Sequence, residues 1–264
     1  MTLRAVLFDL DDTLLWDELS VKEALEATCL FAADKYALDP AALDASVRKE
    51  ARALYESYDT FPFTKMIGIN PFEALWGNFT EGDDPYFRML RQLAPEYRKA
   101  AWTKGLQALG VDDPHFGAEL GERFPEERRK RAYVYADTFQ VLDALKSKYK
   151  LLLLTNGSPD LQKEKLDGIP QLVPYFDHIV ISGQFGRGKP DPSIFEHAVS
   201  LLGIAPGEGI MVGDKLTTDI LGSSRIGMPN VWINHHGADI GEHVPPTYTV
   251  TKLEQLLGII DRLN

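Results

Sequence analysis

A short apolar run near the start of the chain ends directly in a cluster of carboxylates. Residues 5–8 read Ala-Val-Leu-Phe, the composition of a buried strand, and Asp9, Asp11, Asp12 and Thr13 follow at once. Unpaired carboxylates are costly to remove from water, so a buried strand that ends in them needs a neutralising partner. A bound divalent cation is the usual partner, and Mg²⁺ prefers oxygen ligands. The alternative is an acidic surface turn after a strand.

The section between residues 17 and 137 is typical of packed helices. Apolar residues recur at helical spacing over residues 18–36, again from Pro40, and then over residues 72–79, 86–110 and 116–131. Residues 59–71 are aromatic and contain proline and glycine, so we expect a loop there. This section shows no strand-like alternation and no repeat.

From residue 138 onwards, short apolar strands alternate with helices. The predicted strands are residues 151–154, 179–181, 210–212, 231–233 and 248–250, and the predicted helices are residues 139–148, 160–166, 192–202, 217–226 and 252–263. Such alternation is typical of a parallel sheet covered by helices on both faces. We therefore expect an α/β fold: a doubly wound, Rossmann-like parallel sheet core formed by residues 1–16 and 137–264, with an inserted α-helical domain formed by residues 17–136.

Polar side chains follow three further predicted strands. In open parallel sheets, ligands bind beyond the carboxyl ends of the strands, so we expect these side chains to lie at the same edge of the sheet as Asp9. Thr155 and Asn156 follow residues 151–154, Lys189 lies in the loop after residues 179–181, and Asp214 and Asp219 follow residues 210–212. Taken alone, each has an ordinary structural explanation, such as a helix N-cap turn or a solvated loop lysine. Their order after successive strands favours a single site.

These positions resemble the motifs of the haloacid dehalogenase (HAD) superfamily. The family pattern Asp-x-Asp-x-Thr matches residues 9–13, and Gly-Lys-Pro-Asp-Pro at residues 188–192 is similar to its lysine motif. Thr155 holds the position of the family's phosphate-binding Thr or Ser, and Gly-Asp at residues 213–214, followed by Asp219, resembles the acidic fourth motif. The resemblance covers the whole chain and implies a core built from both ends with a cap domain, residues 17–136, in the middle.

The resemblance implies a chemical role for each of these residues. Asp9 would attack phosphorus and form an aspartyl-phosphate, and Asp11 would act first as general acid and then as general base. Mg²⁺ would be held by the Asp9 carboxylate, the Asp11 backbone carbonyl and the Asp214 carboxylate, with Asp219 in support. The phosphate-binding residues would be Thr155, Asn156 and Lys189.

The implied activity is that of a Mg²⁺-dependent phosphatase acting on a small phosphomonoester metabolite. Three alternatives stay open: a phosphomutase with the same core, a dehalogenase of the superfamily, and a non-catalytic binding module. The dehalogenases do not need an acid two residues after the nucleophile, so Asp11 argues for phosphate. The motif order resembles the branch that contains phosphoglycolate phosphatases, 5'-nucleotidases, acylneuraminate-9-phosphatases and phosphoserine phosphatases. Neither the substrate nor the oligomeric state is specified by the sequence.

Two groups of residues lie outside these motifs. The aromatic residues Phe63 and Trp76, in the inserted section, are candidates for selecting the substrate, with packing in the core of the cap as the alternative. The pair His235-His236 follows a predicted strand, and we expect a surface loop there and not a metal site.

The overall composition limits the partners. The 264 residues carry a net charge of -11, which disfavours a nucleic-acid polymer, because binding to its phosphate backbone requires a basic surface. The longest strongly apolar run, residues 151–154, is far too short to span a bilayer, and the first residues turn acidic before a signal segment forms. The single cysteine, Cys29, fits a reducing compartment. We expect a cytoplasmic protein with no membrane partner.

Overall fold

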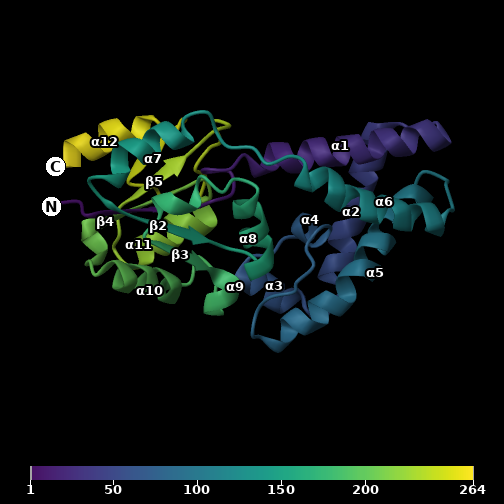
Figure 1. Ribbon diagram of the computed structural model, residues 1–264, viewed down its shortest axis with the longest axis horizontal. Helices are drawn as coiled ribbons and strands as arrows, with labels where there is room; N and C mark the ends of the chain where they lie inside the picture. Colours follow the sequence, from purple (N-terminus) through teal and green to yellow (C-terminus); the bar gives the residue numbers. More distant parts are fainter. Residues whose placement is uncertain (1, 264) are drawn as a thin grey trace. The chain divides into compact units, whose positions relative to one another are not determined.

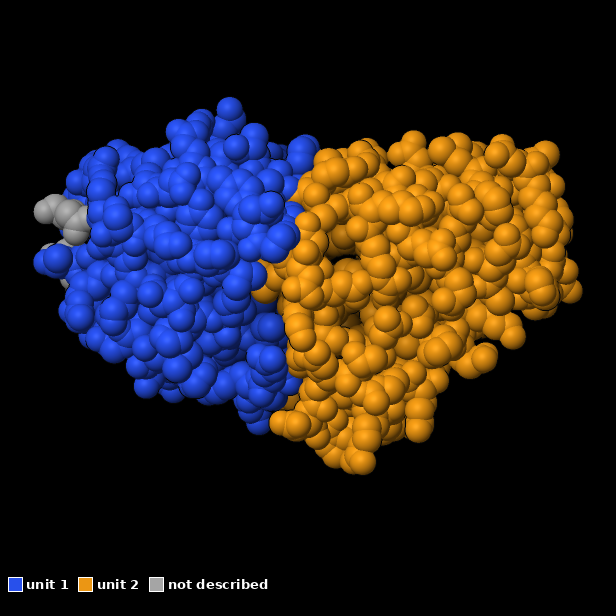
Figure 2. All heavy atoms as spheres, in the orientation of Figure 1, with its two compact units in different colours: residues 1–16, 134–157, 169–264 blue, residues 17–133, 158–168 orange. Residues whose placement is uncertain are grey.

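The computed structural model describes residues 2–263, and the chain divides into two compact units (Figure 2). Unit 1 comprises residues 1–16, 134–157 and 169–264, and unit 2 comprises residues 17–133 and 158–168. The sequence predicts residues 17–136 as the inserted domain, so the division differs at residues 134–136. It also differs at residues 158–168, which group with the helices of unit 2 and not with the sheet.

Within residues 2–263, unit 1 contains a six-stranded sheet in the order β3-β2-β1-β4-β5-β6. The strands are β1 (Ala5–Phe8), β2 (Lys150–Thr155), β3 (His178–Ile181), β4 (Gly209–Gly213), β5 (Asn230–Ile233) and β6 (Tyr248–Val250). All neighbouring strands are parallel, and Phe8 of β1 is aligned with Leu153 of β2 and Val212 of β4. The strand order reverses at β1, which confirms the predicted doubly wound α/β sheet and favours a ligand site at its carboxyl edge.

Helices cover both faces of this sheet, as Figure 1 shows. One side carries α7 (Thr138–Lys146) and α12 (Gln255–Leu263), and the other carries α10 (Pro192–Leu202) and α11 (Leu221–Arg225). Leu7, Leu152 and Met211 of the strands form one hydrophobic cluster with Ile194 and Phe195 of α10. Because both faces are covered, the central strands are continuous apolar runs and do not alternate. The short elements of unit 1 are η1 (Val173–Tyr175), α9 (Ser182–Phe185), η2 (Pro206–Glu208) and η3 (Leu216–Ile220).

Unit 2 is helical. Its helices are α1 (Asp17–Tyr36), α2 (Pro40–Glu56), α3 (Phe61–Ile67), α4 (Pro71–Ala74), α5 (Pro85–Gln107), α6 (Pro114–Arg129) and α8 (Pro159–Asp167). The sequence pair Asp-Pro starts three of them. The carboxylates of Asp39, Asp84 and Asp113 accept backbone N–H groups at 3.0, 2.9 and 2.9 Å, and the following proline needs no hydrogen-bond acceptor.

The sequence-based prediction for the stretch before α5 was wrong in two places. Residues 59–71, predicted as a loop, contain α3, whose buried Phe63 and Ile67 lie one turn apart. Gly68 ends this helix in the left-handed conformation with φ 82°. The predicted helix at residues 72–79 is reduced to the four residues of α4, and Phe79 takes a φ of 52°, which a continuing helix does not allow.

Helix α8 is fixed to unit 2 by ion pairs and packing. The Lys165 ammonium lies 2.9 Å from Glu73 and 3.7 Å from Asp17. The Asp160 carboxylate accepts the N–H of Thr80 at 2.7 Å, and Leu161 belongs to the hydrophobic cluster of unit 2. These contacts explain why residues 158–168 group with the helical unit although they follow a strand of the sheet.

Candidate active site

The first strand ends at Asp9, in the middle of the carboxyl edge of the sheet. The Asp9 N–H donates to the Val212 carbonyl of β4 at 2.9 Å, so the backbone stays in the sheet up to this residue. Asp9 is buried, with 6% of the residue exposed. The chain then turns back on itself, because the N–H of Leu15 donates to the carbonyl of Leu10 at 2.9 Å. Asp11 therefore lies in a closed turn directly after the buried Asp9.

The Lys189 ammonium contacts two carboxylates inside the site. Its Nζ lies 2.6 Å from Asp9 Oδ1 and 2.7 Å from Asp219 Oδ1, and it donates to the Leu154 carbonyl of β2 at 2.7 Å. Two of its three N–H groups thus donate to Asp9 and Leu154, and Asp219 adds a close ion pair. Burial lowers the pKa of Lys189, but Asp219 and Asp9 outweigh this effect and the net shift is upward. The side chain is therefore a fixed positive charge beside Asp9.

Asn156 holds the backbone of Lys189 in place. Its Oδ1 accepts the N–H of Lys189 at 2.8 Å, and its Nδ2 donates to the carbonyl of Lys189 at 2.9 Å. Two bonds between one amide and one residue fix the orientation of that residue as well as its position. The sequence predicts a phosphate-binding role for Asn156. Its side-chain amide bonds the backbone of Lys189, and a direct contact with phosphate stays a prediction.

Thr155, the expected phosphate-binding hydroxyl, is the last residue of β2 and is 1% exposed. Because β2 pairs with β1, Thr155 ends the strand next to the one that leads into Asp9. The chain turns immediately afterwards at Gly157, whose φ of 147° is rarely adopted by residues with a side chain. The Gly157 N–H donates to Ser182 Oγ at 2.9 Å, which ties this turn to the end of β3.

A glycine at the end of β4 allows Asp219 to reach the site. A Cβ on Gly213 would lie 2.4 Å from both Cγ and Oδ2 of Asp219, which is far inside normal contact distance. Asp219 is fully buried, and its Oδ2 accepts the backbone N–H of Lys215 at 3.1 Å while its Oδ1 faces Lys189. Asp214 follows Gly213 in the chain, and its backbone carbonyl accepts the indole N–H of Trp232 at 2.8 Å.

Three carboxylates of these loops can share one cation. Asp9, Asp214 and Asp219 each offer an oxygen, and these three oxygens lie within 4.8 Å of one another. Burial raises the pKa of Asp9 to about 6 and that of Asp214 to about 9; neighbouring carboxylates add to both shifts, and nearby lysines oppose them. Buried carboxylates that resist ionisation together are stabilised by a hard divalent cation with oxygen ligands. The residues therefore fit the expected Mg²⁺ site.

Comparison with known proteins identifies the family. Residues 3–227 match the family model of the haloacid dehalogenase-like hydrolases. The chain belongs to this family.

The HAD-like hydrolases most similar in sequence include several phosphatases. The phosphoserine phosphatase of Thermus thermophilus is 35% identical over 88% of this chain and 89% of its own length. The N-acylneuraminate-9-phosphatase of Mus musculus is 34% identical over 64% of this chain and 69% of its own length. Among solved structures, a HAD phosphatase from Thermococcus onnurineus matches with a TM-score of 0.56 and 27% identity, covering 98% of both chains. The magnesium-bound HAD-hydrolase YfnB from Bacillus subtilis matches with a TM-score of 0.68 and 22% identity, covering 99% of this chain and 100% of YfnB.

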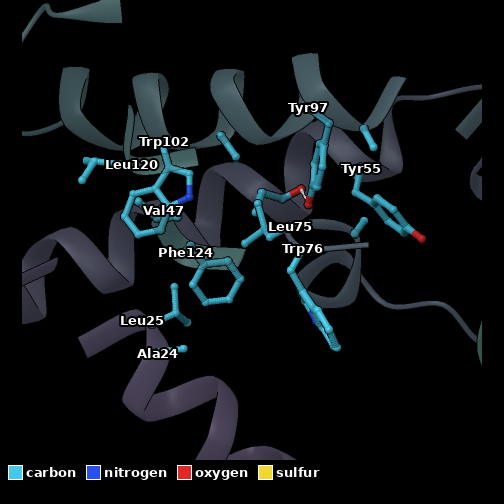
Figure 3. Packing of buried hydrophobic residues seen from close by; sticks show 14 of the residues in the cluster. Ala24, Leu25, Val47, Tyr55, Leu75, Trp76, Tyr97, Trp102, Leu120 and Phe124 are labelled. Carbon is cyan, nitrogen blue, oxygen red and sulfur yellow. Dashed lines mark hydrogen bonds between the residues drawn. The ribbon is translucent and has the colours of Figure 1, made fainter. Parts of the chain in front are cut away.

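Phe63 and Trp76, the aromatic candidates for substrate selection in this HAD-like hydrolase, lie inside unit 2. They are 5% and 2% exposed and belong to its hydrophobic cluster, part of which is drawn with Trp76 labelled in Figure 3. The Arg128 guanidinium lies over the Trp76 ring at 4.6 Å. This burial favours the packing alternative, and a role in substrate selection stays a prediction.

Sequence reasoning missed three residues that shape the HAD-type site. Lys215 acts to lower the pKa of Asp214, although burial raises it by more. The sequence signal for this role was the position of the lysine directly after that aspartate. Trp232, on the neighbouring strand β5, donates its indole N–H to the Asp214 carbonyl and so orients that backbone. No local sequence pattern indicates that these two residues are partners. His235, expected in a surface loop, is half-buried and contacts the turn that contains Asp11 through the Asp12 carbonyl.

Proposed function

We propose that this HAD-like hydrolase is a Mg²⁺-dependent phosphatase that hydrolyses a small phosphomonoester metabolite through an aspartyl-phosphate on Asp9. The observation that carries the proposal is the Lys189 ammonium 2.6 Å from Asp9 Oδ1, beside a cluster of three carboxylates of which Asp9 and Asp219 are buried and Asp214 is half-buried. A carboxylate and a phosphate dianion repel each other, so the nucleophile needs fixed positive charge beside it before the two can meet. The relatives named as phosphatases support the same reaction class.

The proposed reaction has two displacements at phosphorus. An Asp9 oxygen forms a bond to phosphorus while the bond from phosphorus to the ester oxygen breaks, and Asp11 gives its proton to the departing oxygen. Asp11 then takes a proton from a water molecule, whose oxygen attacks phosphorus and releases inorganic phosphate and the Asp9 carboxylate. Lys189 and Thr155 stabilise the charge on the phosphoryl oxygens in both steps.

The proposed metal ligands are the carboxylates of Asp9 and Asp214 and the backbone carbonyl of Asp11, with Asp219 positioning Lys189. When bound, Mg²⁺ supplies positive charge that offsets these carboxylates and the substrate phosphate. A supporting role fits Asp219 because both of its oxygens already have contacts. Oδ1 pairs with the Lys189 ammonium, and Oδ2 accepts the backbone N–H of Lys215.

The proposed partner is a small phosphorylated metabolite, and we propose that unit 2 selects it while unit 1 carries out the chemistry. The net charge of -11 argues against a nucleic-acid polymer. Among residues 2–263, no helix is long and apolar enough to cross a lipid bilayer. A cytoplasmic location stays a prediction.

Dehalogenation is the competing reaction with structural support, since a structure described as a dehalogenase matches with a TM-score of 0.65 and 25% identity over 97% of this chain and 96% of the dehalogenase. The carboxylate of Asp11 and the acidic cluster of Asp9, Asp214 and Asp219 favour phosphate, because dehalogenation through Asp9 needs neither. A phosphomutase would use the same core to move a phosphoryl group, and a non-catalytic module would bind the phosphorylated ligand without turning it over.

The test is a panel of phosphorylated metabolites with the purified protein and Mg²⁺, scored by release of inorganic phosphate. A 2-haloacid with halide detection and a sugar phosphate with isomer detection run in parallel. We expect phosphate release that requires Mg²⁺, and a phosphorylated Asp9 peptide after rapid acid quenching. Halide release without phosphate release would refute the proposal in favour of a dehalogenase, and inactivity on all three panels would favour a binding module.

A further inference from the structure

His235 links the loop after β5 to the turn that contains Asp11. Its ring Nε2 lies 3.0 Å from the carbonyl oxygen of Asp12. A carbonyl oxygen only accepts hydrogen bonds, so the imidazole donates from Nε2. Strand β4 separates β5 from β1 in the sheet, and this bond therefore connects two loops that do not follow neighbouring strands.

An aromatic stack holds the His235 ring in position. The ring lies nearly parallel to Tyr135, with centroids 4.3 Å apart and an interplanar angle of 11°. Tyr135 in turn stacks on Trp16 at 5.3 Å and 16°, and its backbone N–H donates to the carbonyl of Leu14 at 3.2 Å. All these residues belong to unit 1, and the stack is thus attached to the turn at both ends.

The contact falls on a constrained residue. Asp12 has a φ of 58°, the left-handed conformation that is costly for a residue with a side chain. Its N–H donates to the carbonyl of Leu15 at 2.7 Å, and its own carbonyl accepts from His235. In a planar trans peptide the Asp12 N–H and the Asp11 carbonyl point in opposite directions, so a fixed N–H also fixes that carbonyl. The two bonds together hold both peptides that flank Asp12.

We propose that His235 is a positioning residue for Asp11. Its hydrogen bond to Asp12 keeps the turn in the conformation in which Asp11 offers its backbone carbonyl to the metal and its carboxylate to the leaving oxygen. The expected effect of His235 on kcat rests on the proposed phosphatase function. Its expected effect on Mg²⁺ affinity rests on the metal site alone.

The test separates the hydrogen bond from the aromatic packing. His235→Phe keeps a ring for the stack and removes the donor, whereas His235→Gln restores an amide donor. Alanine is avoided because it would enlarge the cavity of about 350 Å³ that the three rings line. His236→Phe is the matched control, since His236 is the exposed neighbour of His235.

A hydrogen bond of this kind is worth about fivefold in an equilibrium or rate. For His235→Phe we expect kcat on an alkyl phosphate to fall about fivefold or more, with a smaller change for para-nitrophenyl phosphate, whose leaving group needs less help from Asp11. Calorimetric titration with Mg²⁺ alone should show severalfold weaker binding. His235→Gln should recover part of both losses, and His236→Phe should match the wild type.

Unchanged kcat and Mg²⁺ affinity in His235→Phe would overturn the proposal. So would equal losses on both substrates with a lowered Tm and no recovery in His235→Gln, because that pattern belongs to general destabilisation. If the wild type releases no phosphate from any ester but His235→Phe still binds Mg²⁺ more weakly, the proposed function fails and the positioning of the Asp11 carbonyl stands.

Discussion

Replacing Gly213 by alanine should damage the site although it replaces none of the proposed catalytic or metal-binding residues. The added Cβ would lie 2.4 Å from Cγ and Oδ2 of Asp219, and ordinary contact begins at 3.4 Å, so the carboxylate must move by about 1 Å. Asp219 is fully buried and is held by Lys189 at 2.7 Å and by the N–H of Lys215 at 3.1 Å. A shift of this size breaks at least one of these contacts.

The expected cost has two parts. Overpacking a buried site costs about 1–3 kcal/mol of folding stability, and each kcal/mol lowers the Tm of a chain this size by about 2–4 °C. Displacing the partner of Lys189 by 1 Å should also lower kcat/KM by up to about a hundredfold, because misplacement on this scale is enough to spoil the alignment of reacting groups. Thermal unfolding and kcat/KM for para-nitrophenyl phosphate with saturating Mg²⁺ measure the two parts separately.

Gly258→Ala is the matched control. A Cβ at Gly258, in α12, meets no atom within 4 Å, and alanine is favoured over glycine in a helix by about 1 kcal/mol. This variant should keep full activity with an unchanged or raised Tm. If Gly213→Ala also kept wild-type kcat/KM and Tm, the close approach of Asp219 to β4 would have no functional importance and the reasoning would be refuted.

Three further predictions concern the nucleophile, the metal and the aromatic residues of unit 2. Asp9→Asn should abolish phosphate release with the fold retained, and Asp11→Asn should slow alkyl phosphates more than aryl phosphates; near wild-type turnover of Asp9→Asn, free of wild-type contamination, would contradict the covalent mechanism. Chelation should stop the reaction, and Mg²⁺ should restore it and stabilise the folded state by about 2.7 kcal/mol at a hundredfold excess over Kd; activity that survives exhaustive chelation would exclude the metal site. Trp76→Ala and Phe63→Ala should each lower stability by about 3–5 kcal/mol and reduce kcat/KM equally for the native substrate and para-nitrophenyl phosphate; a selective loss on the native substrate would restore their role in recognition.

The sheet was predictable because its strands are fully buried. Runs such as residues 5–8 and 151–154 are apolar at every position, and no other assignment for segments so short, each followed by a helix, buries them as well. The gathering of the acidic side chains and Lys189 in one place was predictable for a related reason, whereas their catalytic roles stay predictions. Polar side chains directly after such strands must meet at one edge of a parallel sheet, whatever the rest of the chain does.

The errors arose where local patterns compete with long-range contacts. Residues 59–71 carry loop-forming Pro and Gly, yet α3 forms because Phe63 and Ile67 are buried in unit 2. Helix α8 was assigned to the core because it follows β2, but Glu73 and Lys165, which attach it to unit 2, are separated by 92 residues. The side-chain contact of Asn156 with Lys189 spans 33 residues and leaves no local pattern.

The buried charges of the two units explain why one cluster is a candidate site and the other is not. In unit 2, Asp17 pairs with Arg128 and Lys165, and Lys165 also pairs with Glu73, so acids and bases balance. Such a network balances its charges internally and joins α1, α4, α6 and α8.

In unit 1, by contrast, the carboxylates of Asp9, Asp11, Asp214 and Asp219 outnumber the ammonium groups of Lys189 and Lys215. An excess of negative charge in a largely buried site is unfavourable for folding. Burial is the largest cause that raises the pKa of Asp214 to about 9, and the carboxylates of Asp9 and Asp219 add to it. Retaining these acids is understandable if a divalent cation completes the charge balance and leaves Asp9 ionised to act as a nucleophile. The same acidic excess that is unfavourable for folding is thus what would let the site bind a cation and a phosphate together.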